Sequence, residues 1–153
     1  MYKKIMVPLD GSELAECVLP HVEAFIRGFN IDHVTLMRVV EPERNYGGEY
    51  AIDPNVVTGR ESARQSSARD YLNQIAARYA KEDTTFQIEV MFGRVAESLA
   101  VYAESNGIDL ILIATHGRSG VTRWVRGSVA DKILRSSNLP VLMVRAPGTE
   151  KGI

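Results

Sequence analysis

Cysteine is nearly absent from this sequence, in which Cys17 is the single example. A chain with one cysteine forms no internal disulfide framework, and no cluster of cysteine and histidine has the spacing of a zinc site. Cys17 falls within a helical pattern, which favours a half-buried packing role over a reactive thiol. The fold must therefore depend on a hydrophobic core, and 153 residues, 45% of them apolar, suffice for one domain spanning residues 1–153.

Long hydrophobic runs and an excess of one charge are missing as well. The formal net charge is -1, and acidic and basic residues are interspersed along the chain, so no nucleic-acid partner is expected. No apolar run approaches the length that crosses a membrane, and the first residues lead into a short strand pattern rather than a signal peptide. We expect a cytoplasmic protein that binds neither nucleic acid nor membrane.

Four apolar runs and one segment that alternates polar with apolar residues have the pattern of β-strands, and helical patterns separate them. The strand patterns cover residues 5–9, 34–40, 85–92, 110–114 and 139–144. Apolar spacing predicts a first helix capped by Ser12, kinked at Pro20 and ended by Gly28, and further helices near residues 68–79, 95–105 and 128–134. Strict alternation predicts an α/β fold with an open five-stranded parallel sheet and helices on both faces. The third and last strands have the features of edge strands.

Residues 41–57 show no regular pattern and are predicted to form a flexible loop. The segment contains Pro42, Gly47, Gly48 and Pro54 together with two tyrosines. A loop of this length inside a compact domain is usually a lid, a binding loop or a mobile segment. Two interpretations stay open, a mobile flap over a site and plain disorder.

The segment after the fourth strand carries the strongest functional signal. The strand at residues 110–114 leads into residues 115–120, which contain Gly117 and Gly120, and Gly127 and Ser128 precede the next helix. Unpaired backbone N–H groups and the positive end of a helix dipole meet in such a loop, which is the geometry that binds phosphate. Ligands of parallel sheets bind at the carboxyl ends of strands where the strand order reverses. Asp10, after the first strand, would face this loop if the two strands are neighbours.

Three better known nucleotide sites do not fit the sequence. A dinucleotide fingerprint needs G-x-G-x-x-G after the first strand, where this chain has Pro8-Leu9-Asp10-Gly11-Ser12. A Walker A loop needs Gly-Lys, and that pair does not occur in the sequence. A pyrophosphatase-type loop would have a denser Ser-Gly-Gly turn. A phosphate site must therefore lie in the later loop.

At these positions the chain resembles the universal stress protein family over almost its whole length. Its ATP-binding members carry G-x2-G-x9-G-(S/T), and the matching residues here are Ala114, Gly117, Gly127 and Ser128. The spacing agrees, but alanine replaces the first glycine and adds a methyl group where a ribose or a backbone approaches. Residues 7–12, with the Asp10 turn, and residues 124–128 resemble the same branch of the family.

The resemblance implies a fold and a set of ligand-binding residues. The implied strand order is 3-2-1-4-5, that of the adenine-nucleotide alpha-hydrolase-like fold. Asp10 and Val39 would flank an adenosine, chiefly through backbone contacts, whereas amides near the last helix would hold the phosphates. The expected ATP-binding residues are Pro8, Leu9, Asp10, Val39, Ala114, Gly117, Arg118, Gly120, Gly127, Ser128 and Val129. Asp10 and Ser128 are the candidate ligands for a metal ion such as Mg²⁺.

The implied function is ATP binding by a regulatory or stress-response homodimer that pairs through its last strand, from Val141 to Val144. At most weak ATPase activity is expected, because no residue in the sequence stands out as a catalytic base. Its protein partner is not indicated. The alternative is a dimeric interaction module of the same fold that binds no nucleotide. A nucleotide-handling enzyme of the wider adenine-binding group would need a catalytic signature on the first loop, and the sequence has none.

Each candidate residue also has a simpler structural interpretation. The glycines at 117, 120 and 127 are compatible with ordinary turns, and Asp10 with a cap on the helix that follows it. Ser128 fits an N-cap, a role compatible with phosphate binding. His116 has neither a nucleophile nor a partner acid in view, which favours a hydrogen bond that braces the loop.

Overall fold

The computed structural model describes residues 1–42, 54–115 and 129–146, and α2 begins the second of these ranges. The strands are β1 (Lys4–Pro8), β2 (His33–Val40), β3 (Thr85–Phe92), β4 (Leu110–Thr115) and β5 (Val141–Arg145). The helices are the 3-10 helix η1 (Ala15–Val18), α1 (Leu19–Phe29), α2 (Pro54–Tyr79), α3 (Val95–Ser105) and α4 (Val129–Ser136). Gly117, Arg118, Gly120, Gly127 and Ser128, with residues 43–53 of the predicted loop, lie outside the described residues.

The five strands form one parallel sheet in the order β3-β2-β1-β4-β5, which confirms the predicted topology. β1 lies in the middle, with β2 along one edge and β4 along the other. The chain builds β2 and β3 on one side of β1 and then crosses to β4 on the other side. The strand order therefore reverses at the carboxyl ends of β1 and β4, the place where ligands of open α/β sheets bind. β3 and β5 are the edge strands, as predicted.

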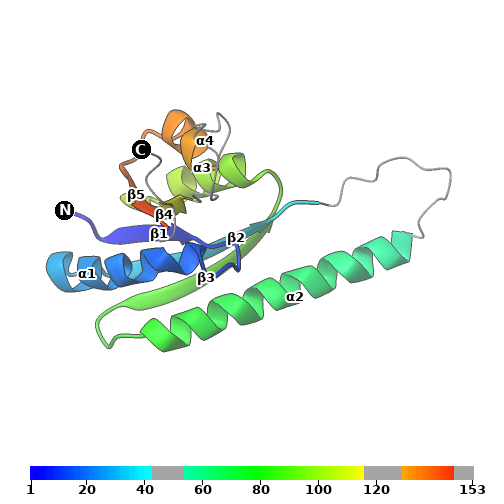
Figure 1. The fold of residues 1–153 in the computed structure, drawn as a ribbon, viewed down its shortest axis with the longest axis horizontal. Coiled ribbons are helices and arrows are strands. Elements are labelled where there is room, and N and C mark those ends of the chain that lie inside the picture. The colour runs from blue at the N-terminus through cyan, green and yellow to red at the C-terminus, as the bar shows by residue number, and fades with distance from the viewer. Residues whose placement is uncertain (43–53, 116–128, 147–153) are drawn as a thin grey trace, which may run out of the picture.

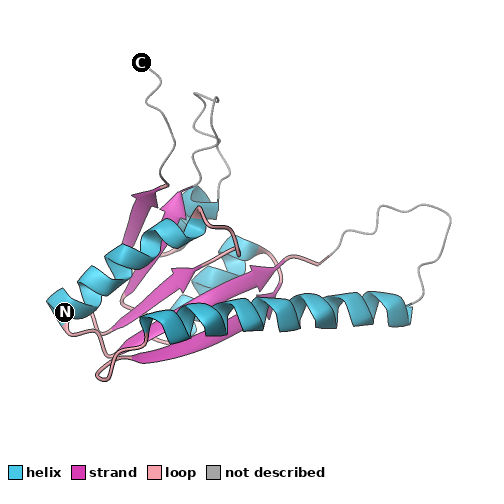
Figure 2. Cartoon of the chain, turned by 60° about the horizontal axis from the view of Figure 1, so that its bottom comes forward, coloured by secondary structure: helices cyan, strands magenta, loops and turns pink. Residues whose placement is uncertain are grey.

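Helices cover both faces of the sheet, as Figures 1 and 2 show. α1 and α2 pack on one face through residues such as Leu19, Val22 and Leu72, which share a core with Val7 and Leu36. α3 and α4 pack on the other face. Their core residues include Leu99 and Ile133, and the sheet contributes Met6, Met37 and Ile111. Because alternate residues of β1 and β4 point into two different cores, the sequences of both strands are continuous apolar runs.

The start of the first helix differs from the prediction. Pro20 does not kink a helix, because residues 15–18 form the separate 3-10 helix η1 and Pro20 lies in the first turn of α1, where its missing N–H breaks no hydrogen bond. Ser12 does cap this region, since its Oγ accepts a hydrogen bond of 3.2 Å from the Ala15 N–H. Gly28 does not end α1 either. The helix continues to Phe29 and ends at Asn30, which adopts the left-handed conformation with φ 51°.

α2 begins earlier than predicted and extends beyond the sheet. Residues 54–57, assigned to the loop by their sequence, belong to this helix of 26 residues. Ala68, Leu72 and Ile75 anchor its C-terminal half in the core, whereas no residue from Gly59 to Ser67 is buried. Figure 2 shows the N-terminal half projecting past the strands. In the described ranges, no helix combines the length and the apolar character needed to cross a membrane.

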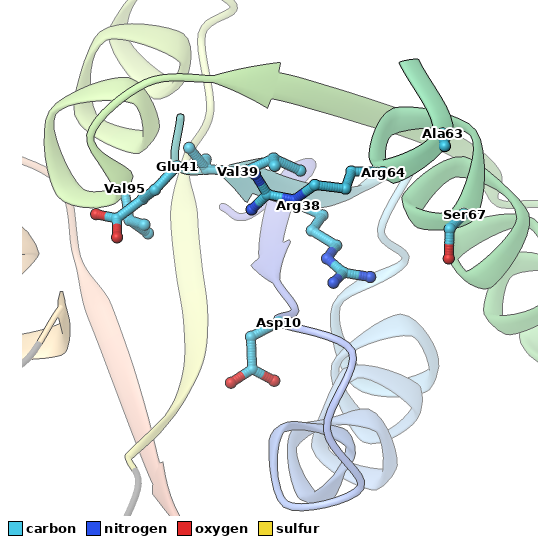
Figure 3. Close-up of a pocket in the computed structure, with 9 residues that line it drawn as sticks. Asp10, Arg38, Val39, Glu41, Ala63, Arg64, Ser67 and Val95 are labelled. Atoms are coloured by element: carbon cyan, nitrogen blue, oxygen red, sulfur yellow. The ribbon is translucent and has the colours of Figure 1, made fainter. Parts of the chain in front are cut away.

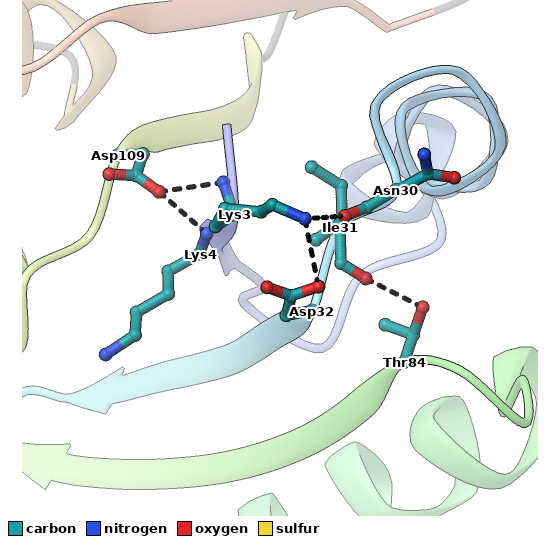
Figure 4. A network of polar contacts seen from close by, with 7 residues as sticks. All are labelled: Lys3, Lys4, Asn30, Ile31, Asp32, Thr84 and Asp109. Atoms are coloured by element: carbon teal, nitrogen blue, oxygen red, sulfur yellow. Dashed lines mark hydrogen bonds and ion pairs between the residues drawn. The ribbon is translucent and has the colours of Figure 1, made fainter. Parts of the chain in front are cut away.

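Polar contacts join the amino ends of four strands, β1, β2, β3 and β4 (Figure 4). Asp109 Oδ2 accepts hydrogen bonds of 2.8 Å from the backbone N–H groups of both Lys3 and Lys4, and so ties β4 to the start of β1. On the opposite side, Lys3 Nζ lies 3.2 Å from Asp32 Oδ1, and Thr84 Oγ1 donates to the Ile31 carbonyl at 2.9 Å. These contacts fix the register of the central strand at the end remote from the predicted ligand site.

Asp109→Ala is expected to lower the free energy of unfolding by about 1–2 kcal/mol, because two N–H groups lose a charged acceptor that water only partly replaces. Urea denaturation measures the loss. Glu82→Ala is the control, since Glu82 is exposed in the turn before β3 and its removal should change stability by less than about 0.5 kcal/mol. Equal effects of the two substitutions would contradict the role given to Asp109.

Candidate functional site

A cavity of about 500 Å³ opens at the carboxyl ends of β1 and β2, beside the point where the strand order reverses. β1 and its turn supply Asp10, the end of β2 supplies the floor, and α2 and the start of α3 supply the walls (Figure 3). The described residues that line it are Asp10, Arg38, Val39, Val40, Glu41, Ala63, Arg64, Ser67 and Val95. Its volume lies within the range typical of small-molecule sites.

The turn after β1 is held by the Asp10 carboxylate. Asp10 Oδ1 accepts hydrogen bonds from the Ser12 N–H at 2.9 Å and from the Ser12 hydroxyl at 2.6 Å. Gly11, between them, has φ 87°, a conformation that glycine adopts without strain. These bonds of Asp10 lie within the turn and do not cap the helix that follows, which begins at Ala15. The Asp10 side chain nevertheless remains exposed and lines the cavity, so holding the turn and contacting a ligand are compatible.

The predicted site residues divide into three groups. Asp10 and Val39 line the cavity together. Pro8, Leu9, Ala114 and Val129 are not among the described residues that line it. Leu9 and Ala114 are 3% and 6% exposed and belong to the core under α1 and α2, so the Ala114 methyl group packs inside the protein. Val129 is the first residue of α4. The remaining predicted residues, at 117–128, lie outside the described residues.

Two arginines that line the cavity were not predicted from the sequence. Arg38 occupies a position of β2 whose same-face neighbours, Leu36 and Val40, are buried. A charged residue inside an apolar strand face was the available signal. Arg64 comes from α2, where nothing in the local pattern distinguishes it from the other polar residues of that helix. Both line the cavity, Arg38 from β2 and Arg64 from α2.

Arg38 is held in place by a chain of contacts that runs through α2. Its guanidinium carbon lies 6.0 Å from the centroid of the Tyr71 ring, within the range of a cation–π contact. The Tyr71 hydroxyl donates to Glu16 Oε1 at 3.1 Å, and Arg78 Nη1 lies 3.2 Å from Glu16 Oε2. Burial raises the pKa of Tyr71 well above its ordinary value, and the nearby Glu16 charge raises it further, so the phenol stays a hydrogen-bond donor. These contacts tie α2 to η1.

The described residues contain no group of three or more His, Cys, Asp or Glu side chains that could hold a metal ion. The two carboxylates that line the cavity belong to Asp10 and Glu41. Such a site suits a divalent cation only if the ligand supplies most of its oxygen atoms, as the phosphates of a nucleotide do with Mg²⁺.

Comparison with known proteins gives consistent matches. The model of the Universal stress protein family matches residues 1–145. Universal stress protein MJ0577 of Methanocaldococcus jannaschii is 29% identical over 157 residues, which cover 95% of this chain and 96% of that protein. The solved structure of MJ0577 superposes with a TM-score of 0.79 at 28% identity, covering 97% of this chain and 99% of that one.

Two more distant structures share the fold and contain nucleotides. A universal stress protein in complex with cAMP superposes with a TM-score of 0.66 at 17% identity, covering 95% of this chain and 98% of that one. A family protein from Arabidopsis thaliana with AMP bound gives 0.64 at 12% identity, covering 97% and 94%. At these identities the likeness concerns the fold alone.

Gly11→Ala is expected to destabilise the protein by about 1–3 kcal/mol, because alanine is strained at this positive φ. Its Cβ would also lie 2.9 Å from Arg38 Nη1 and displace that side chain. Gly28→Ala is the matched control. Position 28 is helical with no heavy atom within 4 Å of an added Cβ, so the protein should gain about 0.5–1 kcal/mol. Chemical denaturation measures the free energy of unfolding of both variants. If both substitutions changed it with the same sign, the conformational requirement for glycine at position 11 would be refuted.

Proposed function

This chain belongs to the universal stress protein family, and we propose that it is a member that binds ATP at the carboxyl edge of its sheet. The observation that carries the proposal is the cavity of about 500 Å³ beside the reversal of strand order, lined by both Asp10 and Val39. The family resemblance had assigned those two residues to an adenosine site. The AMP and cAMP held by two proteins of this fold support a nucleotide as the ligand.

In the proposed complex, Asp10 and Val39 flank the adenosine, and Pro8 and Leu9 contribute only backbone atoms. For Leu9 this contribution would come from the carbonyl, since its side chain is buried and its N–H donates to the Met37 carbonyl at 2.8 Å. The phosphates bind the amides of the loop between β4 and α4, the proposed role of Gly117, Arg118, Gly120, Gly127 and Ser128, with Val129 at the helix start. Mg²⁺ would be held chiefly by the phosphates, with Asp10 and Ser128 as the candidate protein ligands.

The proposed biological role is regulation rather than fast catalysis. Efficient phosphoryl transfer needs a positioned nucleophile, a metal clamp and stabilisation of the leaving group. No histidine lines the cavity among the described residues. We propose a cytoplasmic homodimer with at most weak ATPase activity, in which the bound nucleotide alters the surface offered to a protein partner.

β5 is the proposed dimer strand. It pairs with β4 along one edge and has no strand along its other edge within the described sheet, and Met143 on it is 41% exposed. An uncovered edge of this kind is a ready template for pairing with another copy of the same strand. Residues Val141 to Val144 would form that pairing.

ATP binding is tested by mass spectrometry of small molecules released from the purified protein, followed by titration of the emptied protein with ATP. The fluorescence of Trp124, the single tryptophan of the sequence, and calorimetry both report binding. Gly127→Val should weaken ATP binding at least about tenfold, because a branched side chain blocks the amides that hold the phosphates and each charged hydrogen bond is worth about 1.5–3 kcal/mol.

Gly28→Ala, remote from the cavity on α1, is the control and should leave ATP affinity unchanged. Circular dichroism establishes that each variant is folded. Unchanged ATP affinity in a folded Gly127→Val variant would remove the phosphate assignment. A wild-type protein that binds no adenine nucleotide yet still dimerises would instead favour the interaction module.

A further inference from the structure

Arg38 and Arg64 differ from most other arginines of the described residues in having no carboxylate partner. Arg27, Arg78, Arg94 and Arg135 each form an ion pair with a glutamate or an aspartate. Arg38 and Arg64 form none with any residue that the structure describes, although Asp10 and Glu41 line the same cavity. Figure 3 shows both side chains on the α2 side of the cavity.

The position of Arg38 is fixed before any ligand arrives. Its guanidinium lies against the Tyr71 ring on one side, and its Nη1 approaches the backbone of Gly11 so closely that an added Cβ would stand 2.9 Å away. Tyr71 is itself held by Glu16. A guanidinium preorganised in this way loses little conformational entropy on binding an anion.

Arg64 presents a polar atom that lacks a partner. Its Nη1 is buried and makes no hydrogen bond in the described structure. An unsatisfied buried donor carries an unfavourable desolvation energy, which a hydrogen-bond acceptor in the cavity would remove. Arg64 lies one helical turn before Ala68, which is buried against the sheet, so its side chain projects from the same face of α2.

Two guanidinium groups at one cavity wall match the chemistry of a phosphate group. Each guanidinium offers several N–H donors in a fixed plane, which fits the oxygens of phosphate better than any neutral group of a purine base. The α2 wall therefore favours a ligand with negative charge on that side.

The proposed phosphate loop follows β4, whereas Arg38 is on β2, and β1 lies between these strands. Adjacent strands are about 4.8 Å apart, so β2 and β4 are separated by roughly 10 Å. A ligand that reaches both strands can therefore place a different group at each. Two phosphates on different carbons of one ribose do extend in different directions from the sugar.

We propose that Arg38 and Arg64 form a second phosphate subsite, which binds a phosphate on the ribose 2′ or 3′ oxygen of an adenine nucleotide. The inference rests on the proposed function, since it requires the 5′ chain to lie at the loop before α4. The preferred ligand class is then an adenosine bisphosphate rather than a nucleotide with phosphate at the 5′ position alone.

Calorimetric titration of the whole emptied chain tests the subsite with three ligands that share a 5′ monophosphate. They are AMP, adenosine 3′,5′-bisphosphate and adenosine 2′,5′-bisphosphate. At least one bisphosphate should bind tenfold or more tightly than AMP, and the preferred isomer identifies the position of the second phosphate. ATP, titrated in parallel, tests the proposed function by itself.

Arg38→Gln and Arg64→Gln should each lower bisphosphate affinity by a larger factor than AMP affinity, so that most of the bisphosphate gain is lost. Arg60→Gln is the matched control, because Arg60 is an exposed arginine on the same helix, one turn earlier, and should leave the gain intact. Arg38→Lys keeps the charge but lacks the planar fork, so it should retain part of the gain even if Arg38→Gln folds poorly.

The possible failures are distinguishable. ATP binding without any bisphosphate gain would overturn the second subsite and leave the proposed function in place. An equal loss of AMP and bisphosphate affinity in the two glutamine variants would also overturn it, because the arginines would then serve the base or the 5′ phosphate. If neither ATP nor AMP nor a bisphosphate binds, the proposed function fails, and the inference that depends on it fails too.

Discussion

The double pairing of β1 is the constraint on which the other features of this protein depend. A strand of five residues contacts β2 and β4 along its two edges and a different layer of helices on each face. Ile5, Met6 and Val7 are fully buried as a result. The chain can continue from β3 to β4 only by crossing β1, so the carboxyl end of β1 has no crossover packed directly above it. The Asp10 turn and the cavity occupy that place.

The elements that the sequence predicted well are those governed by local apolar pattern. All five strands were located within about two residues, because the central strands are continuous apolar runs bounded by turns and the edge strand β3 alternates polar with apolar residues. The errors at Pro20 and Gly28 have local causes. Proline is compatible with the first turn of a helix as well as with a kink, and Asn30 adopts the left-handed conformation that glycine was expected to supply.

The site residues at the ends of strands could be predicted from the sequence, whereas the residue that reaches the cavity through helix packing could not. The Asp10 turn was identified from the sequence pattern and Val39 from the family resemblance, and the topology brings these two positions together. Arg64 reaches the cavity only because α2 begins at Pro54 and crosses β2 at a particular angle. No periodicity within α2 encodes that crossing, since it results from how Ala68, Leu72 and Ile75 fit the sheet.

The uneven anchoring of α2 couples the cavity to the order of the helix. Arg64 lies at the boundary between the half that is packed on the sheet and the half that is not, where a helix opens most easily in solution. A ligand bound by the Arg64 side chain would stabilise the adjacent turns of the helix. Ligand binding in the cavity would then slow amide hydrogen exchange and increase resistance to proteases along the projecting half of α2.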